Sequence, residues 1–387
     1  MNVLIIRNAE ALTNANIRRV ASALLSAGHK PIILSRSRIC EPGKIEYVNK
    51  NIVVDGEEVE NYELQLSGKT EKGLKNITTV YNYIKIIKKW MLENKEKFQV
   101  IHAFDLDSGI AARKVAKKTG KKFVYHIADF YADSRAKIPG VLKNMIKSME
   151  FGIINDADET IICTDERKEQ IKGSNPKHLS VVYNSPSVDK EILQKVESFR
   201  GERPSEIGKL RLCYIGMLSK RRFIDSVLKV VSQMDDVELV LAGTGDLAEM
   251  CRDYSERFKN ISFLGKVAYN DTFEEYRKCN LMFAIYNPNI NNHKYSAANK
   301  IYEAMMLEKP IVVAKNTSMD TIVDKYDIGF SIDYSEEEFY SLLDKLRKNL
   351  NILDEKAGNM KGIYEDYSWN KMKNRIVEIY SGLGDEK

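Results

Sequence analysis

The sequence predicts an α/β protein with two Rossmann-like domains, each built on a parallel sheet, that face a cleft. Three observations support this fold class. The chain has 387 residues, whereas one domain ordinarily takes about 100–200. Short apolar runs, typical of buried strands, alternate with segments of helical periodicity. The alternation forms two series, which meet in a polar stretch with prolines and glycines over residues 184–209.

The first series opens with an apolar run at residues 3–6, as expected for a strand that is buried on both faces. A helix with one apolar side follows; Gly28 closes it, and residues 31–34 begin the next strand, which completes a βαβ unit. Further strands are predicted at 100–103, 123–125, 161–163 and 181–183, with a helix at 108–119. Residues 45–67 alternate loosely with charges and are interpreted as an edge hairpin or a long loop.

The second series begins near residue 210 and has the same alternating pattern. Its predicted strands lie at 210–215, 237–242, 261–264, 281–285 and 311–313, and its helices near 224–231, 246–257, 271–278 and 298–307. The tail from residue 369 predicts a final helix with apolar residues on one side. We place the domain boundary between residues 185 and 186, and the second domain over 186–368.

Composition excludes several classes of protein. Hydrophobic residues make up 43% and charged residues 30%, which excludes a collagen-like or disordered chain. No apolar stretch reaches the roughly 18 residues that a membrane span requires, and the first residues lack the features of a secretory signal. The five cysteines form no CxxC pair, so neither a zinc site nor a disulfide framework is expected. These features together predict a cytoplasmic protein.

Charge is distributed unevenly. Residues 1–190 carry a balance of +8 and the remainder −3. The basic first half favours an anionic partner, and the alternative is a solvated lysine-rich surface. Residues 83–92 and 137–149 interleave lysines with apolar residues, which suits either an anionic membrane surface or a helix packed on the core. The charge is moderate and no recognition motif is present, so no nucleic acid is expected.

Two turns of the second series are candidates for binding phosphate. Gly216 ends a predicted strand and is followed within six residues by Arg221 and Arg222, just before a helix. Backbone N–H groups, a helix N-terminus and guanidinium groups are what a phosphate needs. Gly243 and Gly245 end the next strand, where glycines permit close approach to a ligand. The alternatives are an exposed basic loop and an ordinary tight turn.

Two further clusters are candidates for polar chemistry. Asn299, Lys300 and Glu303 open a predicted helix; Asn299 and Glu303 share a face, where a carboxylate can accept both hydroxyls of a ribose and Lys300 can meet a phosphate. His126 and Asp129 follow a strand of the first series and could orient a hydroxyl nucleophile. The alternatives are a surface helix and a structural hydrogen-bonded pair.

Taken together, the motifs resemble a known family. Tyr214-Ile215-Gly216 before basic residues, Ala242-Gly243-Thr244-Gly245, Phe263-Leu264-Gly265-Lys266-Val267 and Asn299-Lys300-Ile301-Tyr302-Glu303 occur in this order. Leu24–Lys30, Val100–Ala103, Val181–Pro186 and Tyr367-Ser368-Trp369 extend the match to nearly the whole chain. The sequence is similar to the retaining glycosyltransferases of family 4, which have the GT-B fold.

The resemblance implies an acceptor-binding first domain, which includes the tail helix 369–387, and a second domain that binds a nucleotide-diphosphate sugar. It implies that Gly216, Arg221, Arg222 and Lys300 hold the diphosphate. Glu303 would hold the ribose, with Gly243, Gly245, Val267 and Asn299 around the nucleoside. Asp129 and His126 would lie near the acceptor hydroxyl. Three positions depart from the family's pattern: Tyr295 where it has a carboxylate, Met217 where it often has a cation, and Ala128 where many members have a histidine.

The resemblance also implies the chemistry. The sugar would pass with retention from a UDP or GDP donor to a glycan or lipid-linked hydroxyl, in glycan, polysaccharide or glycolipid biosynthesis. Cations rather than a metal ion would stabilise the leaving diphosphate, and no cofactor is expected. The one DxD sequence, Asp105-Leu106-Asp107, is interpreted as a helix N-cap. A lipid-linked acceptor would place the enzyme at the inner face of the membrane.

Three other functions compete with this interpretation. A sugar-nucleotide epimerase of the same fold would turn over its donor without an acceptor. A non-catalytic nucleotide-sugar-binding subunit is suggested by Tyr295. A dinucleotide oxidoreductase is disfavoured, because Arg7-Asn8-Ala9-Glu10 follows the first strand where a GxGxxG motif would be needed.

Overall fold

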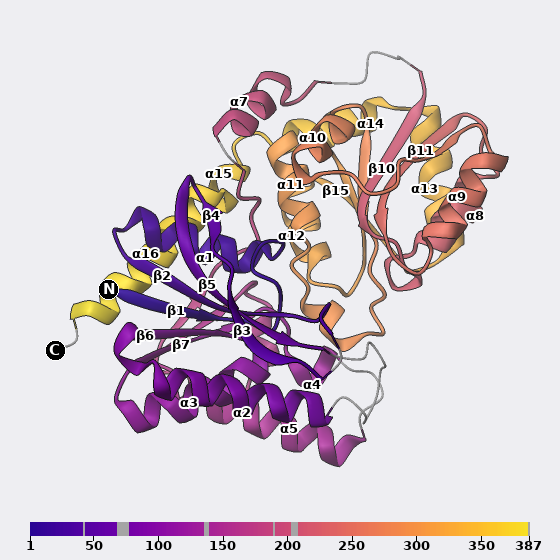
Figure 1. The fold of residues 1–387 in the computed structure, drawn as a ribbon. Coiled ribbons are helices and arrows are strands. Elements are labelled where there is room, and N and C mark those ends of the chain that lie inside the picture. Colours follow the sequence, from indigo (N-terminus) through magenta and orange to yellow (C-terminus); the bar gives the residue numbers. More distant parts are fainter. Residues whose placement is uncertain (42, 68–76, 135–138, 189, 203–207, 386–387) are drawn as a thin grey trace. The chain divides into compact units, whose positions relative to one another are not determined.

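The computed structural model describes residues 1–41, 43–67, 77–134, 139–188, 190–202 and 208–385. The chain divides into two compact units (Figure 1). The first unit comprises Met1–Tyr183 together with Asn370–Lys387, and the second comprises Asn184–Trp369. The expected first boundary was after residue 185, and the structure divides the chain after Tyr183.

The first unit has a sheet in which nine strands are described, in the order β3-β5-β2-β1-β6-β7-β8-β9, with β4 paired to β5. The strands from β5 to β9 along this path are parallel, and β3 and β4 are antiparallel to β5. Their bounds are β1 Asn2–Ile6, β2 Lys30–Ser37, β3 Ile45–Asn49, β4 Ile52–Val54, β5 Glu57–Leu66, β6 Val100–Phe104, β7 Lys122–Ile127, β8 Glu159–Ile162 and β9 Leu179–Val181.

Helices cover both faces of this sheet. Figure 1 shows α2, α3 and α5 on one face and α1 and α16 on the other. The bounds are α1 Ala15–Ser26, α2 Ile77–Glu93, α3 Asp105–Thr119, α4 Tyr131–Ser134, α5 Gly140–Asp156, α6 Arg167–Gln170 and α16 Trp369–Asp385, with a short 3₁₀ helix η2 at Lys95–Lys97. The final helix therefore packs on the first sheet, where Met372, Ile376 and Tyr380 are buried.

Burial explains why the central strands were recognisable in the sequence. All five residues of β6 are buried, as are four of the five residues of β1. The edge strand β3 is mostly exposed, and the polar residues Glu46 and Asn49 interrupt its apolar residues, so it lacks an apolar run. Residues 45–67, expected to be an edge hairpin or a long loop, therefore form β3, β4 and β5, and β5 pairs with β2 in parallel. The last strand ends at Val181, earlier than the expected 183.

The second unit has an entirely parallel sheet in which six strands are described, in the order β12-β11-β10-β13-β14-β15. The strands are β10 Leu210–Met217, β11 Val237–Thr244, β12 Ile261–Phe263, β13 Leu281–Ala284, β14 Ile311–Ala314 and β15 Gly329–Ile332. The order runs outwards from β10 in both directions, which is the doubly wound arrangement. Ligands of such sheets bind outside the carboxyl ends of the strands where the order reverses, here between β10 and β13.

The helices of the second unit are α7 Lys190–Phe199, α8 Ile224–Val231, α9 Ala248–Arg257, α10 Tyr269–Arg277, α11 Asn299–Leu307, α12 Met319–Tyr326, α13 Glu336–Lys348, α14 Asn351–Asn359 and α15 Tyr364–Tyr367, with 3₁₀ helices η3 Lys220–Arg222 and η4 Asn291–Tyr295. Figure 1 shows α8, α9 and α13 on one side of the sheet and α10 and α11 on the other. The α/β fold with parallel sheets is therefore confirmed.

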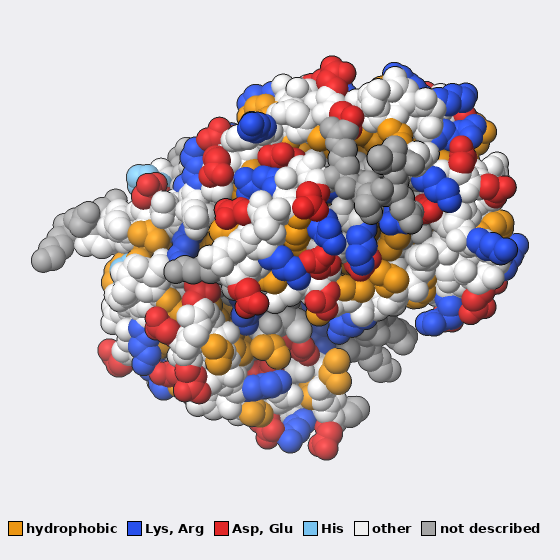
Figure 2. Space-filling model, turned by 90° about the horizontal axis from the view of Figure 1, so that it is seen from above, with side chains coloured by type: hydrophobic (Ala, Val, Ile, Leu, Met, Phe, Trp, Pro, Cys, Tyr) orange, Lys and Arg blue, Asp and Glu red, His pale blue; other side chains and the backbone are white. Residues whose placement is uncertain are grey.

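Two surface properties bear on the expectations about partners. None of the described helices is long and apolar enough to cross a lipid bilayer. Positive and negative side chains are interspersed on the face seen in Figure 2. The segment 83–92 lies in α2, where Tyr83, Ile87, Trp90 and Met91 are buried, so this helix packs its apolar side on the core. Part of the segment 137–149, including Lys137, lies outside the described residues.

Candidate functional site

Glycines lie at the strand ends beside the switch point of the second sheet. Gly216 at the end of β10 pairs in register with Gly243 at the end of β11. A Cβ atom on Gly243 would lie 1.8 Å from the carbonyl oxygen of Gly216, and one on Gly245 would lie 2.1 Å from that of Leu218. No side chain fits at either position, so the two turns pack backbone against backbone.

Lys300 brings a cation to this edge. It is the second residue of α11, and its Nζ would lie 2.8 Å from a Cβ atom placed on Gly216. The ammonium also lies 4.4 Å from the ring centroid of Tyr214. Lys300 forms no ion pair with any residue that the structure describes. An ammonium without a carboxylate partner, at the N-terminus of a nine-residue helix, favours an anionic ligand.

Arg222 brings a second cation from η3, the turn that connects β10 to α8. Its guanidinium carbon lies 3.4 Å from the ring centroid of Tyr286, which follows β13 on the other side of the switch point. The Nη1 atom is buried and has no hydrogen-bond partner among the described residues. Leaving a buried charged donor unpaired is costly, so this atom favours an acceptor that the chain itself does not supply.

Arg221 differs from its neighbour. Its side chain is exposed, and its backbone carbonyl accepts the N–H of Asn287 at 3.1 Å. Phe223 turns the chain after these arginines with a φ of 63° and a buried ring. A left-handed bulky residue is strained by roughly 1–3 kcal/mol, and the packing of its ring holds the turn in place.

Glu303 lies one turn along α11 from Asn299 and is only 5% exposed. The hydroxyl of Tyr269, the first residue of α10, donates to Glu303 Oε1 at 3.4 Å. Asn299 is exposed. Val267 is half-buried in the loop before α10, and Gly265 of the same loop accepts the N–H of Gly243 at 2.7 Å. The glycine turns, the two cations and the buried carboxylate thus all belong to elements that meet at one edge of this sheet.

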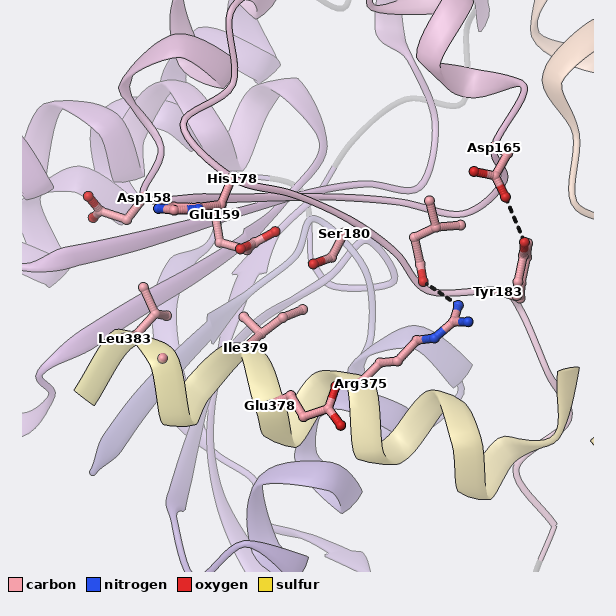
Figure 3. Close-up of a pocket in the computed structure, with 12 residues that line it drawn as sticks. Asp158, Glu159, Asp165, His178, Ser180, Tyr183, Arg375, Glu378, Ile379 and Leu383 are labelled. Carbon is pink, nitrogen blue, oxygen red and sulfur yellow. Dashed lines mark hydrogen bonds between the residues drawn. The ribbon is translucent and has the colours of Figure 1, made fainter. Parts of the chain in front are cut away.

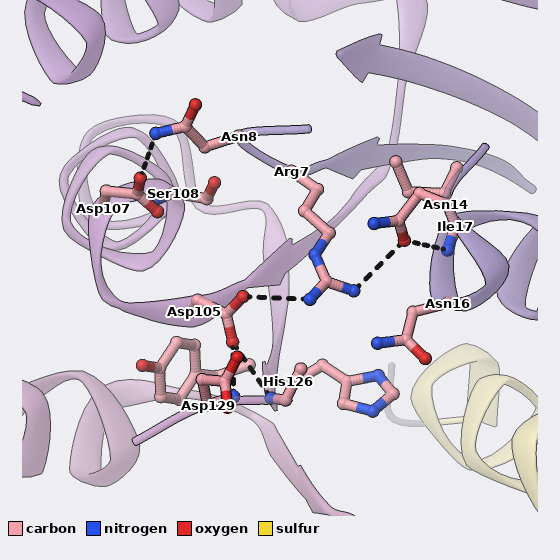
Figure 4. A network of polar contacts seen from close by, with 12 residues as sticks. Arg7, Asn8, Asn14, Asn16, Ile17, Asp105, Asp107, Ser108, His126 and Asp129 are labelled. Atoms are coloured by element: carbon pink, nitrogen blue, oxygen red, sulfur yellow. Dashed lines mark hydrogen bonds and ion pairs between the residues drawn. The ribbon is translucent and has the colours of Figure 1, made fainter. Parts of the chain in front are cut away.

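The first unit has its own polar cluster at the switch point between β1 and β6 (Figure 4). Arg7, which follows β1, forms an ion pair with Asp105 at 3.3 Å. Asp105 Oδ1 accepts the backbone N–H groups of Ala128 at 3.0 Å and Asp129 at 2.9 Å. Burial raises the pKa of Asp105 to about 6, although Arg7 opposes the shift. The side chain of Asp129 is exposed at this edge.

The interpretation of Asp105-Leu106-Asp107 as an N-cap was wrong for Asp105. Helix α3 already begins at Asp105, and the N-cap position is Phe104. Asp105 has a φ of 61°, and its carboxylate holds the loop after β7 instead of capping its own helix. Asp107 Oδ1 accepts the N–H of the next residue, Ser108, at 2.8 Å.

His126 is not brought together with Asp129. Figure 4 shows its ring directed away from Asp129, toward α16. Its Nδ1 lies 3.1 Å from Nε2 of His102, whose Nδ1 lies 2.6 Å from the hydroxyl of Tyr380. Burial lowers the pKa of His126 well below its usual range and that of His102 to about 3, so both rings are neutral near pH 7. The pair links β7 and β6 to the final helix.

Comparisons with known proteins bear on this geometry. Residues 209–349 match the family described as Glycosyl transferases group 1. No curated protein sequence matches the chain. Sucrose-phosphate synthase from Thermosynechococcus elongatus matches the structure with a TM-score of 0.75 and 12% identity, and 100% of each chain is covered. Anabaena Alr3699/HepE in complex with UDP has a TM-score of 0.67 and 13% identity, covering 99% of this chain and 100% of its own.

A third structure, from E. coli, is described as trehalose-6-phosphate bound with UDP-2-fluoro glucose. It matches with a TM-score of 0.68 and 9% identity, and 98% of each chain is covered. Identities this low establish the fold. The chain has the GT-B glycosyltransferase fold. The resemblance seen in the sequence is confirmed at the level of the fold and of the group 1 match, and the assignment to family 4 stays a prediction.

Within this GT-B fold, the structure shows which residues the sequence analysis missed. Tyr286 stacks on Arg222, and Tyr269 donates to Glu303. Neither tyrosine belongs to one of the sequence motifs, and each contact joins elements that are distant in the sequence. A signal for Tyr286 existed, since it lies two residues after the end of β13, at the switch point where ligands of such sheets bind. Tyr295, at the end of η4, stands where the family's pattern has a carboxylate.

Proposed function

We propose that the chain is a retaining glycosyltransferase that moves a sugar from a nucleotide-diphosphate sugar to a hydroxyl acceptor. The observation that carries the proposal is the pair of cations at the second switch point. Arg222 presents a buried guanidinium nitrogen with no partner among the described residues, and Lys300 presents an ammonium with no described ion pair. Both belong to the unit that matches the group 1 family.

A diphosphate is the ligand that this edge fits best. Its oxygens can accept from Arg222 and Lys300, and the missing side chain at Gly216 lets the Lys300 ammonium lie against the end of β10. When the bond between the sugar and the diphosphate breaks, negative charge grows on the leaving oxygen. Two cations already fixed in place stabilise that charge without reorganisation. The leaving phosphate then accepts the proton of the attacking hydroxyl.

The nucleoside is assigned to Glu303. A buried carboxylate oriented by the Tyr269 hydroxyl can accept both hydroxyls of a ribose. Asn299, Val267, Gly243 and Gly245 border the same edge. We propose that the donor is a UDP-sugar in preference to a GDP-sugar, because the structures similar to this chain include complexes with UDP and UDP-glucose.

The acceptor is assigned to the first unit. Asp129 is exposed at the carboxyl edge of that sheet, and its backbone is fixed by Asp105. We propose that its carboxylate contacts the acceptor hydroxyl. His126 does not contact the acceptor in this proposal; it supports the loop through its buried contact with His102.

A lipid-linked acceptor is part of the proposal. Helix α5 exposes Val141, Met145 and Met149, by 86%, 55% and 41%, at a spacing of four residues that places them on one face. Lys147 is on the same helix. An exposed apolar strip on a helix that also carries lysines on its flanks suits contact with an anionic lipid surface. Cosedimentation with anionic vesicles should fall on replacing Val141 and Met145 by Ser, and unchanged binding would exclude this face.

Turnover tests the proposal. The full chain is incubated with UDP-glucose, other UDP-sugars and GDP-sugars, with EDTA, in the presence and absence of hydroxyl acceptors. We expect acceptor-dependent release of one nucleoside diphosphate and a product whose anomeric configuration, read by NMR, equals that of the donor. Conversion of the donor without an acceptor would identify an epimerase. Donor binding with no turnover would identify a binding subunit, and an inverted product would refute retention.

A further inference from the structure

The first unit contains a cavity that the proposed function does not use (Figure 3). Its volume is about 570 Å³. The strand side is formed by Glu159 of β8 and by His178 and Ser180 at the edge strand β9, and the helix side by Ile379 and Leu383 of α16. Neither Asp105 nor Asp129 lines it, so it is distinct from the polar cluster at the first switch point.

Glu159 is the unusual feature of this cavity. It is only 8% exposed, and its Oε1 atom is buried without a hydrogen-bond partner among the described residues. Burial raises the pKa of Glu159 above its usual value, and the Ser180 hydroxyl and the nearby His178 oppose this shift. Figure 3 shows its carboxylate between the strands and α16. Since buried polar groups are almost always paired, an unpaired carboxylate oxygen here indicates a donor that a ligand would supply.

Of the other three acidic residues that line the cavity, two form ion pairs and one does not. Asp158 pairs with Lys177 at 2.9 Å, and Asp165 pairs with Lys168 at 2.7 Å. Glu378 of α16 is exposed and forms no ion pair within the described residues. Two carboxylates, Glu159 and Glu378, therefore line the cavity without a salt-bridge partner among the described residues.

The one arginine of the cavity is already engaged. Arg375 Nη1 donates to the carbonyl of Val181 at 2.9 Å, and its guanidinium carbon lies 5.6 Å from the ring centroid of Tyr183. The Tyr183 hydroxyl donates to Asp165 at 2.8 Å. Arg375 thus closes one end of the cavity beside a tyrosine and an acid, and Glu159 and Glu378 remain for a ligand.

We propose that this cavity binds a small organic diammonium ion. One ammonium donates to the buried Oε1 of Glu159, and the second pairs with Glu378. The carbon chain between them lies against Ile379 and Leu383. An inorganic cation fits less well, because the described residues hold no cluster of three or more ligating side chains. A neutral diol fits less well, because it leaves the charges of both acids unbalanced.

The test uses the full chain and putrescine as the probe, with 1,4-butanediol as its neutral counterpart, in calorimetric titration at fixed ionic strength. We expect saturable binding of putrescine with one site per chain and none of the diol. Glu159→Gln should weaken putrescine by about tenfold or more, as expected for a charge-assisted hydrogen bond. Glu256→Gln, which removes an exposed carboxylate of the second unit, should leave it unchanged.

A second variant guards against a folding defect in the first. Gly382 lines the cavity from α16, and a Cβ atom there would meet nothing within 4 Å. Gly382→Leu should therefore fold and abolish binding by filling the cavity. Absence of saturable putrescine binding, equal binding of the diol, or putrescine affinity that both variants leave intact would each overturn the proposal. Donor turnover is measured in parallel and is expected to be normal in both variants.

Discussion

Replacement of Arg222 by Ala separates ligand binding from stability more cleanly than other changes at the second switch point. The guanidinium stacks 3.4 Å from the Tyr286 ring centroid, and its buried Nη1 has no described partner. The folded chain would therefore lose only the stacking, about 0.5–2 kcal/mol. A bound diphosphate would lose a charge-assisted hydrogen bond, about 1.5–3 kcal/mol. That corresponds to about a 10- to 150-fold rise in Kd.

The assay is calorimetric titration of the nucleoside diphosphate with EDTA, together with urea unfolding of each variant. Arg221→Ala is the matched comparison, because it removes the same charge from the adjacent, exposed position. We expect Arg221→Ala to change Kd by no more than about threefold, as for a screened surface charge. An unchanged Kd in Arg222→Ala would refute the assignment. Equal losses in both variants would show a general effect of charge instead of a specific contact.

Three further predictions follow from the same structure. Glu303→Gln should weaken UDP by about tenfold while inorganic pyrophosphate binds as before, since only the ribose contact is lost; parallel losses in titrations of both ligands would count against that role. Gly243→Ala should destabilise the fold by about 1–3 kcal/mol in urea, because its Cβ would lie 1.8 Å from the Gly216 carbonyl oxygen, whereas Gly358→Ala, with nothing within 4 Å, should not. Burial raises the pKa of Glu150 to about 8 from 4.5, so the folded chain keeps a proton that the unfolded chain releases and stability falls as pH rises through this window. The fall attributable to this group is at most about 5 kcal/mol, and Glu150→Gln should flatten the slope of unfolding free energy between pH 5 and 8; an unchanged slope would contradict the shift.

The sheets could be predicted from the sequence because their central strands are buried on both faces. Residues 3–6 and 100–103 consist largely of apolar side chains for that reason, and both lie in the middle of the first sheet. The strands over 45–67 were not resolved in the same way. The edge strand β3 is mostly exposed, and β5 alternates buried side chains with charged ones. The pairing of β5 depends on β2, which no local pattern reveals.

The candidate site was predictable only in part, and the reason is geometric. Gly216 lies near the end of a strand, and Lys300 and Glu303 lie in the first five residues of a helix. Such positions can be recognised from a short stretch of sequence. Arg222 could be named, but its stacking on Tyr286 joins two loops that are 64 positions apart in the chain. His126 lies close to Asp129 in sequence, yet its ring turns into the core of the first unit.

Metal-free binding of nucleotides tests the central claim most directly. The full chain is titrated with UDP, GDP, ADP, CMP and NAD in EDTA, and the midpoint of thermal unfolding is recorded. The account predicts that one nucleoside diphosphate stabilises the chain, by about 2.7 kcal/mol at 100 times its Kd. An unfolding midpoint that no diphosphate changes, or one that only NAD raises, would contradict it.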